Sequence, residues 1–236
     1  MGALAVGRLN AVAQPERNNV RLGFWLLTVG AVAALGYATR LTTQGANASQ
    51  DRNVLYHWST AAGGVFQFGI FLAIVLAISG RSPERLGLRR PASWPRALGL
   101  AGVVFVVCFI GLGLLDRLFH GGQEQALTPD RWEPKHAAAF AANFVVIAVI
   151  APVVEELLFR GIGFHLLRRF GDTTAILATG FAFGLYHGLV NALPILALFG
   201  VALAWLRYRT RSVYPGMVVH AAFNSVALIV SVTING

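Results

Sequence analysis

Two adjacent glutamates, Glu155 and Glu156, follow directly after the apolar run of residues 145–154. Arg160 lies four residues beyond Glu156, so these two side chains share one helix face and can form an ion pair. A charged side chain at the centre of a membrane helix costs about 2.5–3.5 kcal/mol on insertion scales, and packing alone does not justify that cost. We therefore expect a function here, although an interfacial ion pair that ends a helix would have the same spacing.

Two histidines and an asparagine lie in later apolar segments. His187 follows Phe183 by one helical turn. His220 and Asn224 are also four residues apart, which places the imidazole and the amide on one stripe of a helix. A single histidine in such a segment is often only structural. Three apolar segments that each carry side chains of this kind indicate a shared site.

Two carboxylates, two imidazoles and an amide are suited to hydrolysis. A glutamate can deprotonate water, a histidine can move the proton, and an amide or a second imidazole can stabilise an oxyanion. The same set could hold zinc in a site of two histidines and one carboxylate with an open position for water. A proton-coupled transporter uses similar residues, so the set alone leaves a hydrolase and a transporter both open.

The composition places these residues in a membrane protein. Of the 236 residues, 56% are hydrophobic and 12% are charged, whereas soluble domains have roughly 45–50% and about 25%. This excludes a disordered chain and a typical cytosolic globule, and the lone Cys108 excludes a disulfide scaffold. No polar stretch is long enough for a second domain, so we expect a single integral-membrane domain over residues 1–236.

The apolar runs predict an all-α, polytopic transmembrane bundle of about seven spans. The predicted spans are residues 22–38, 54–79, 97–115, 137–160, 173–189, 192–206 and 213–234. We expect the first to be a retained helix, although residues 31–33 resemble a signal-peptide cleavage site. Tryptophans such as Trp25 near the span ends predict an aromatic belt. Four glycines of the third span suggest close helix contact: Gly99, Gly102, Gly111 and Gly113.

The charged links predict the orientation. Residues 81–96, 160–169 and 207–211 are rich in arginine, whereas residues 116–136 mix acids and bases. Seven spans place the arginine-rich links on one side, which is cytoplasmic by the positive-inside rule, with the N-terminus in and the C-terminus out. We expect a bacterial plasma membrane and a site cavity that opens to the cytoplasm. The arginine-rich links then explain the net charge of +9, and we do not expect a nucleic acid as partner.

The three motifs together resemble one family. Glu155-Glu156-x-x-x-Arg160, Phe183-x-x-x-His187 and His220-x-x-x-Asn224, in this order, are similar to the CPBP family of CAAX prenyl proteases and bacteriocin-processing enzymes, also called Abi proteins. The flanking residues 157–161 and 183–188 and the segment 86–91 agree with typical members. The resemblance covers about residues 137–229, which would be the catalytic core.

The resemblance implies an intramembrane endopeptidase. Glu155 would activate the water, with His187 as its partner in proton transfer. His220 and Asn224 would stabilise the oxyanion, and Glu156 and Arg160 would orient the site. As a second possibility, His187, His220 and Glu155 would ligate Zn²⁺ or another divalent metal, as in a metalloprotease. No organic cofactor is implied.

The expected partners are the lipid bilayer and a peptide or lipid-anchored protein substrate. The sequence leaves the oligomeric state open. Two other functions stay open beside the protease: a non-catalytic immunity protein that binds peptide toxins, and the transporter.

Overall fold

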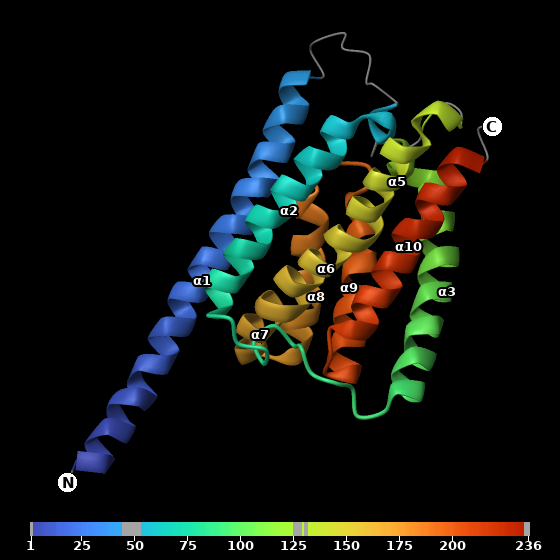
Figure 1. The fold of residues 1–236 in the computed structure, drawn as a ribbon. Helices are drawn as coiled ribbons and strands as arrows, with labels where there is room; N and C mark the ends of the chain where they lie inside the picture. The colour runs from blue at the N-terminus through green and yellow to red at the C-terminus, as the bar shows by residue number, and fades with distance from the viewer. Residues whose placement is uncertain (1, 44–52, 125–128, 130–131, 234–236) are drawn as a thin grey trace.

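The computed structural model describes residues 2–43, 53–124, 129 and 132–233, and within these ranges the chain is helical with no strands. The all-α prediction is confirmed for these residues. The longer helices are α1 (Gly2–Thr43), α2 (Trp58–Ser79), α3 (Trp94–Phe119), α8 (Asp172–Tyr186), α9 (Leu193–Thr210) and α10 (Tyr214–Thr233) (Figure 1). The short elements are η1 (Val54–Tyr56), α4 (Gly121–Glu124), η2 (Pro134–His136) and η5 (Arg168–Phe170).

One continuous helical run connects η2 to η5. It consists of α5 (Ala137–Val145), η3 (Val146–Ile150), α6 (Ala151–Glu156), η4 (Leu157–Gly163) and α7 (Phe164–Leu167), and η3 and η4 have the wider π-helical turn. The run continues beyond the predicted end at Arg160 because the residues after it are apolar and buried, among them Phe164 and Leu166. Glu155 and Glu156 therefore lie inside a long helix.

In the described part of the chain, six helices are long and apolar enough to cross a membrane. The predicted span over residues 173–189 is not among them, because α8 has only 15 residues. A helix of that length spans roughly 22 Å at 1.5 Å per residue, less than the hydrocarbon core of about 30 Å. The predicted end of the last span, Ile234, lies outside the described residues.

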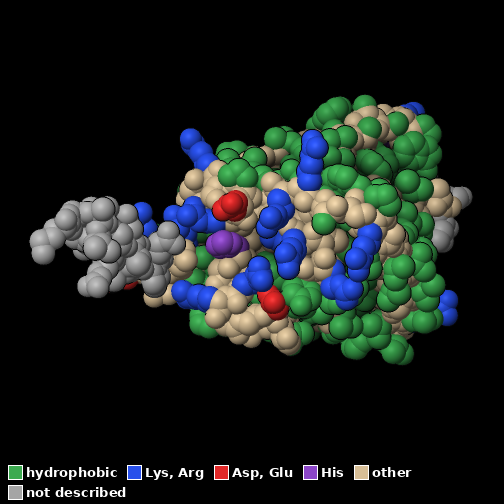
Figure 2. Space-filling view, turned by 90° about the horizontal axis from the view of Figure 1, so that it is seen from below, with side chains coloured by type: hydrophobic (Ala, Val, Ile, Leu, Met, Phe, Trp, Pro, Cys, Tyr) green, Lys and Arg blue, Asp and Glu red, His purple; other side chains and the backbone are tan. Residues whose placement is uncertain are grey.

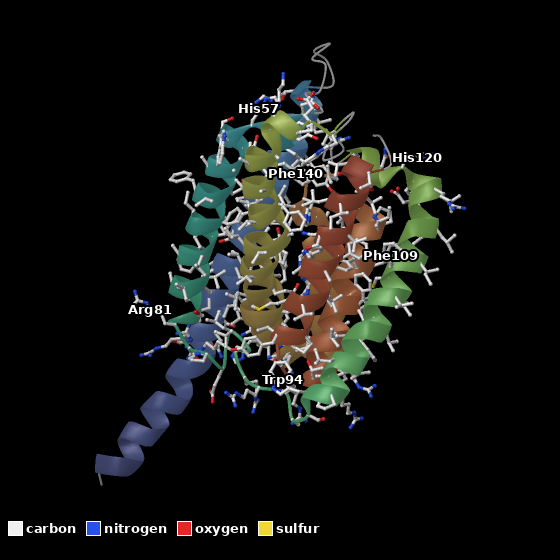
Figure 3. The ribbon with its side chains drawn as sticks, turned by 45° about the vertical axis from the view of Figure 1, so that its right-hand side comes forward. His57, Arg81, Trp94, Phe109, His120 and Phe140 are labelled. Carbon is white, nitrogen blue, oxygen red and sulfur yellow. The ribbon has the colours of Figure 1, made fainter. Side chains whose placement is uncertain are left out.

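The bundle has one arginine-rich end. The start of α1 and the end of α10 lie at opposite ends of the bundle (Figure 1). Figure 3 places Arg81 and Trp94 at one end and His57 and His120 at the other. The view onto the Arg81 end shows many basic side chains (Figure 2), and the only lysine of the sequence, Lys135, lies elsewhere, in η2. The predicted grouping of the arginine-rich links is thus present, and the side of the membrane that they face stays a prediction.

The close helix contacts are not where the glycines of the third span suggested. A Cβ atom added at Gly99, Gly102, Gly111 or Gly113 would meet no described atom within 4 Å, so that prediction is wrong. The close contact joins α8 to α9 instead. A Cβ on Gly200 would lie 2.6 Å from the carbonyl oxygen of Gly180. Small residues let two backbones approach in this way.

Trp25 corrects the aromatic-belt prediction. Its side chain is 1% exposed and its indole N–H donates to the carbonyl oxygen of Leu158 at 2.9 Å. Trp25 therefore packs α1 against η4 and does not lie at an interface. Trp58 and Trp94, in contrast, are exposed.

Candidate active site

The first π-helical segment, η3, connects the long run to α10. The N–H of Ala151 bonds the carbonyl of Val146, five residues back. The next bond in this register would come from residue 152, which is a proline and has no N–H. The carbonyl of Ile147 is thereby left open, and the side-chain amide of Asn224 donates to it at 2.9 Å. Asn224 therefore replaces a missing backbone donor.

The second π-helical segment, η4, follows Glu156 directly. The N–H of Phe164 reaches the carbonyl of Phe159, five residues back. The carbonyl of Leu158 accepts the indole N–H of Trp25, and the carbonyl of Arg160 accepts the Nε–H of Arg207 at 3.1 Å. Side chains from α1 and α9 thus hold the widened turn that carries Arg160. Turns of this kind are frequent at functional sites.

Glu156 and Arg160 form the predicted ion pair, at 2.9 Å between Oε1 and Nη1. Both side chains are 0% exposed, so the pair is buried in the bundle and does not end a helix at an interface. Arg160 also donates from Nη2 to the carbonyl oxygen of Gly200 at 2.8 Å, and its Cζ lies 4.6 Å from the centre of the Phe183 ring. The close α8–α9 contact positions that carbonyl.

His220 of α10 lies between the two carboxylates of α6. Its Nδ1 is 3.3 Å from Oε1 of Glu156, and its Nε2 is 3.6 Å from Oε2 of Glu155. A carboxylate oxygen accepts, so the Nδ1 of His220 carries the hydrogen of its contact with Glu156. With the hydrogen at Nδ1, the Nε2 lone pair of His220 faces the carboxylate of Glu155 at a distance longer than a hydrogen bond. Both facing atoms are therefore able to accept a proton.

His187 comes at the end of α8, where its Nδ1 is 2.7 Å from the carbonyl oxygen of Phe183. A carbonyl only accepts, so Nδ1 carries the hydrogen and the neutral ring has its lone pair at Nε2. The Phe183 ring lies 4.7 Å from the His187 ring and 5.5 Å from the His220 ring, between centroids. Both imidazoles therefore pack on Phe183.

The structure thus groups the predicted residues unequally. Glu155, Glu156, Arg160 and His220 form direct contacts, whereas His187 joins them through Phe183. Within the described ranges no three His, Cys, Asp or Glu side chains are grouped so that they could hold a metal ion. The proposed ligand set of His187, His220 and Glu155 does not have that arrangement, and metal binding stays a prediction.

Two glycines of the site were missed from the sequence. Gly200 supplies the carbonyl that binds Arg160. A Cβ atom on Gly216 would lie 2.7 Å from Oε2 of Glu156, so only glycine leaves room for this carboxylate. The Oε2 atom is buried and has no hydrogen-bond partner among the described residues. The sequence offered one signal for these two positions, namely small residues in the two helices that follow His187.

Three other histidines lie apart from this site. His57, His120 and His136 are exposed, as predicted for residues in or near the outer links. His136 pairs through Nδ1 with Glu133 at 2.8 Å.

The comparisons with known proteins agree with the motifs. Residues 137–226 match the family described as Rce1-like, type II CAAX prenyl endopeptidase. The searches of curated proteins and of solved structures found no match. The matched segment contains all six predicted site residues and, in general, indicates a membrane-embedded endopeptidase. Residues 137–226 are therefore an Rce1-like domain, and the family resemblance predicted from the motifs is confirmed.

Proposed function

We propose that the protein is an intramembrane endopeptidase in which Glu155 and His220 together activate the hydrolytic water. The observation that carries the proposal is the 3.6 Å approach of these two side chains, which are 6% and 3% exposed, within the Rce1-like segment. A carboxylate and a neutral imidazole whose acceptor atoms face each other can take one proton from water.

Glu156 and Arg160 act as positioning residues in this proposal. Glu156 accepts a hydrogen bond from Nδ1 of His220, which turns Nε2 toward Glu155. A carboxylate orients the catalytic histidine of serine hydrolases in the same way. Arg160 fixes the carboxylate of Glu156 through the 2.9 Å ion pair. Their removal should therefore misalign the imidazole even where the fold survives.

The contacts favour His220 over His187 as the proton partner of Glu155. His187 is held through Nδ1 at the Phe183 carbonyl, so its Nε2 can accept a proton and later donate it to the leaving amine. Asn224 of α10 donates to the carbonyl of Ile147 and so holds the long helical run that contains α6 against α10. No step of this proposal depends on a metal, because the three predicted ligands are not grouped as a metal site.

The proposed substrate is a peptide or a lipid-anchored protein that enters from the arginine-rich end of the bundle. We assign this end to the cytoplasm of a bacterial cell by the positive-inside rule. The family description supports a CAAX-type substrate as the first one to test.

Cleavage by the Glu155→Gln variant tests the proposal, because the amide keeps the shape of the carboxylate and removes the base. Purified protein in liposomes would be given peptides that end in a CAAX sequence, with and without a prenyl group. We expect turnover to fall by about 10²–10⁴-fold. Glu84→Gln, at an exposed position of the arginine-rich end, is the control. Unchanged turnover of Glu155→Gln would remove Glu155 from the mechanism.

The same preparation decides the role of a metal. Metal content of the purified wild type and cleavage in the presence of a chelator would be measured together. The proposed mechanism predicts turnover that the chelator does not change. Stoichiometric metal with chelator-sensitive turnover would favour the alternative in which His187, His220 and Glu155 are ligands.

A further inference from the structure

A basic pocket of about 260 Å³ opens at the arginine-rich end, where η5, the start of α8 and the end of α9 meet. Its walls include one carboxylate, Asp172, and four guanidinium groups: Arg168, Arg207, Arg209 and Arg211. The end view shows basic side chains spread over this face of the molecule (Figure 2). The pocket therefore carries an excess of positive charge.

Arg207 is the unusual member of this pocket, because its side chain is 8% exposed and has no carboxylate partner in the described part of the chain. Its Nε donates to the carbonyl oxygen of Arg160, and its Cζ lies 5.5 Å from the centre of the Phe164 ring. Its two terminal nitrogens, Nη1 and Nη2, form no hydrogen bond with any described residue. A nearly buried charge without a counter-charge is costly.

The backbone is shaped to hold this guanidinium. A Cβ atom on Gly87 would lie 2.8 Å from both Nε and Nη2 of Arg207, and Gly87 has a positive φ of 67°. A side chain at this position would displace the guanidinium. The arrangement therefore fixes Arg207 at the wall of the pocket and leaves its terminal nitrogens free for a ligand.

The other arginines add donors that are less restrained. Arg168 uses its Nε on Asp172 at 2.7 Å, and Arg209 lies over the ring of Trp205 at 5.2 Å. Arg209 and Arg211 are exposed. An anion in the pocket would meet one nearly buried guanidinium and up to three exposed ones.

A second basic pocket lies between α1 and the 82–85 link, but two of its three arginines already have acceptors, and the third, Arg17, is exposed. Arg21 donates to Asn18 and Arg85 donates to the carbonyl of Ser79, with Glu84 in the same wall. The pocket at Arg207 differs because this guanidinium is nearly buried and its terminal nitrogens form no hydrogen bond with described residues.

We propose that the Arg207 pocket binds a phosphate group, carried by an anionic lipid or free in solution. Several guanidinium groups that converge on one space match the several acceptor oxygens of phosphate. Basic pockets between membrane helices near the cytoplasmic surface commonly bind lipid headgroups. The bound group would also fix η4, because Arg207 holds the carbonyl of Arg160.

Thermal unfolding of the full chain tests this site without any use of proteolysis, so its result is independent of the proposed function. The protein in neutral detergent would be titrated with inorganic phosphate, with chloride at matched ionic strength as reference. A second arm would compare bilayers of phosphatidylcholine with bilayers that contain phosphatidylglycerol. Ligand that binds the folded state raises the unfolding temperature.

The test variant is Arg209→Gln combined with Arg211→Gln, which removes two exposed donors and leaves Arg207 in place. Arg90→Gln, an exposed arginine outside the pocket, is the control. We expect wild type and control to be stabilised, and the double variant to need at least about tenfold more phosphate or anionic lipid for the same shift. Arg207→Gln should show the same loss where it folds.

Stabilisation by phosphate and by anionic lipid alike would support a site for any phosphate group. Stabilisation by anionic lipid alone, lost in the double variant, would support a headgroup site. The proposal would be overturned if neither ligand stabilised the wild type. It would also be overturned if the double variant and the control responded as the wild type does.

Discussion

Replacement of Arg160 by methionine should strongly destabilise the protein, because it leaves the carboxylate of Glu156 buried without its cation. Both side chains of the pair are 0% exposed. The variant also loses the hydrogen bond to the carbonyl of Gly200 and the contact with the Phe183 ring. Removal of one partner from a buried pair costs about 3–5 kcal/mol. At roughly 2–4 °C per kcal/mol, the unfolding temperature should fall by roughly 6–20 °C.

A second variant separates charge from packing. Glu156→Gln combined with Arg160→Met removes both charges, so part of the stability should return, with a coupling free energy of about 2 kcal/mol. Cleavage should not return, because the carboxylate that accepts the hydrogen bond from His220 is gone. We therefore expect stability and activity to separate in the double variant.

Unfolding in detergent micelles and peptide cleavage in liposomes would be measured on the same preparations of wild type, single and double variants. Arg90→Gln, which removes an exposed arginine, is the control for charge alone. The reasoning is refuted if Arg160→Met unfolds at the temperature of the control. It is also refuted if the double variant is no more stable than Arg160→Met.

Two further changes test the packing of the site. Gly216→Ala should lower the cleavage rate roughly 10–100-fold, because its Cβ would lie 2.7 Å from Oε2 of Glu156; Gly69→Ala, which meets no described atom within 4 Å, should leave the rate unchanged. Asn224→Ala should lower the free energy of unfolding by about 1–3 kcal/mol, because the carbonyl of Ile147 loses its side-chain donor; undiminished stability would contradict the role assigned to Asn224.

Local spacing predicted the parts of the site that lie within one helix. Glu156 and Arg160 are four residues apart, and the ion pair follows from helix geometry alone. Contacts between helices depend on how each helix is rotated and tilted. The spacing of residues in the sequence does not give this information. Hence the sequence could not tell that Glu155 faces His220, or that Phe183 lies against both imidazoles.

Apolarity located six of the seven predicted spans among the described residues, whereas it did not give their exact lengths or their close contacts. Hydropathy cannot show that α8 ends at Tyr186, because the residues after it are also largely apolar. Four glycines in one span look like a packing surface, yet in α3 they face open space. The glycines that matter, Gly200 and Gly216, are single residues whose neighbours are fixed only by the fold. The π-helical turns had one local signal, the proline at position 152.

The hydrogen bond from Trp25 to Leu158 has a consequence for the boundaries of the enzyme. Trp25 lies more than a hundred positions before the segment that the family shares, yet it supplies the donor for a backbone oxygen two positions before Arg160. A fragment that began at residue 137 would remove that donor from the oxygen. The leading helix thus helps to hold the shared segment in place, and a transfer of that segment between proteins would have to supply a donor at the same position.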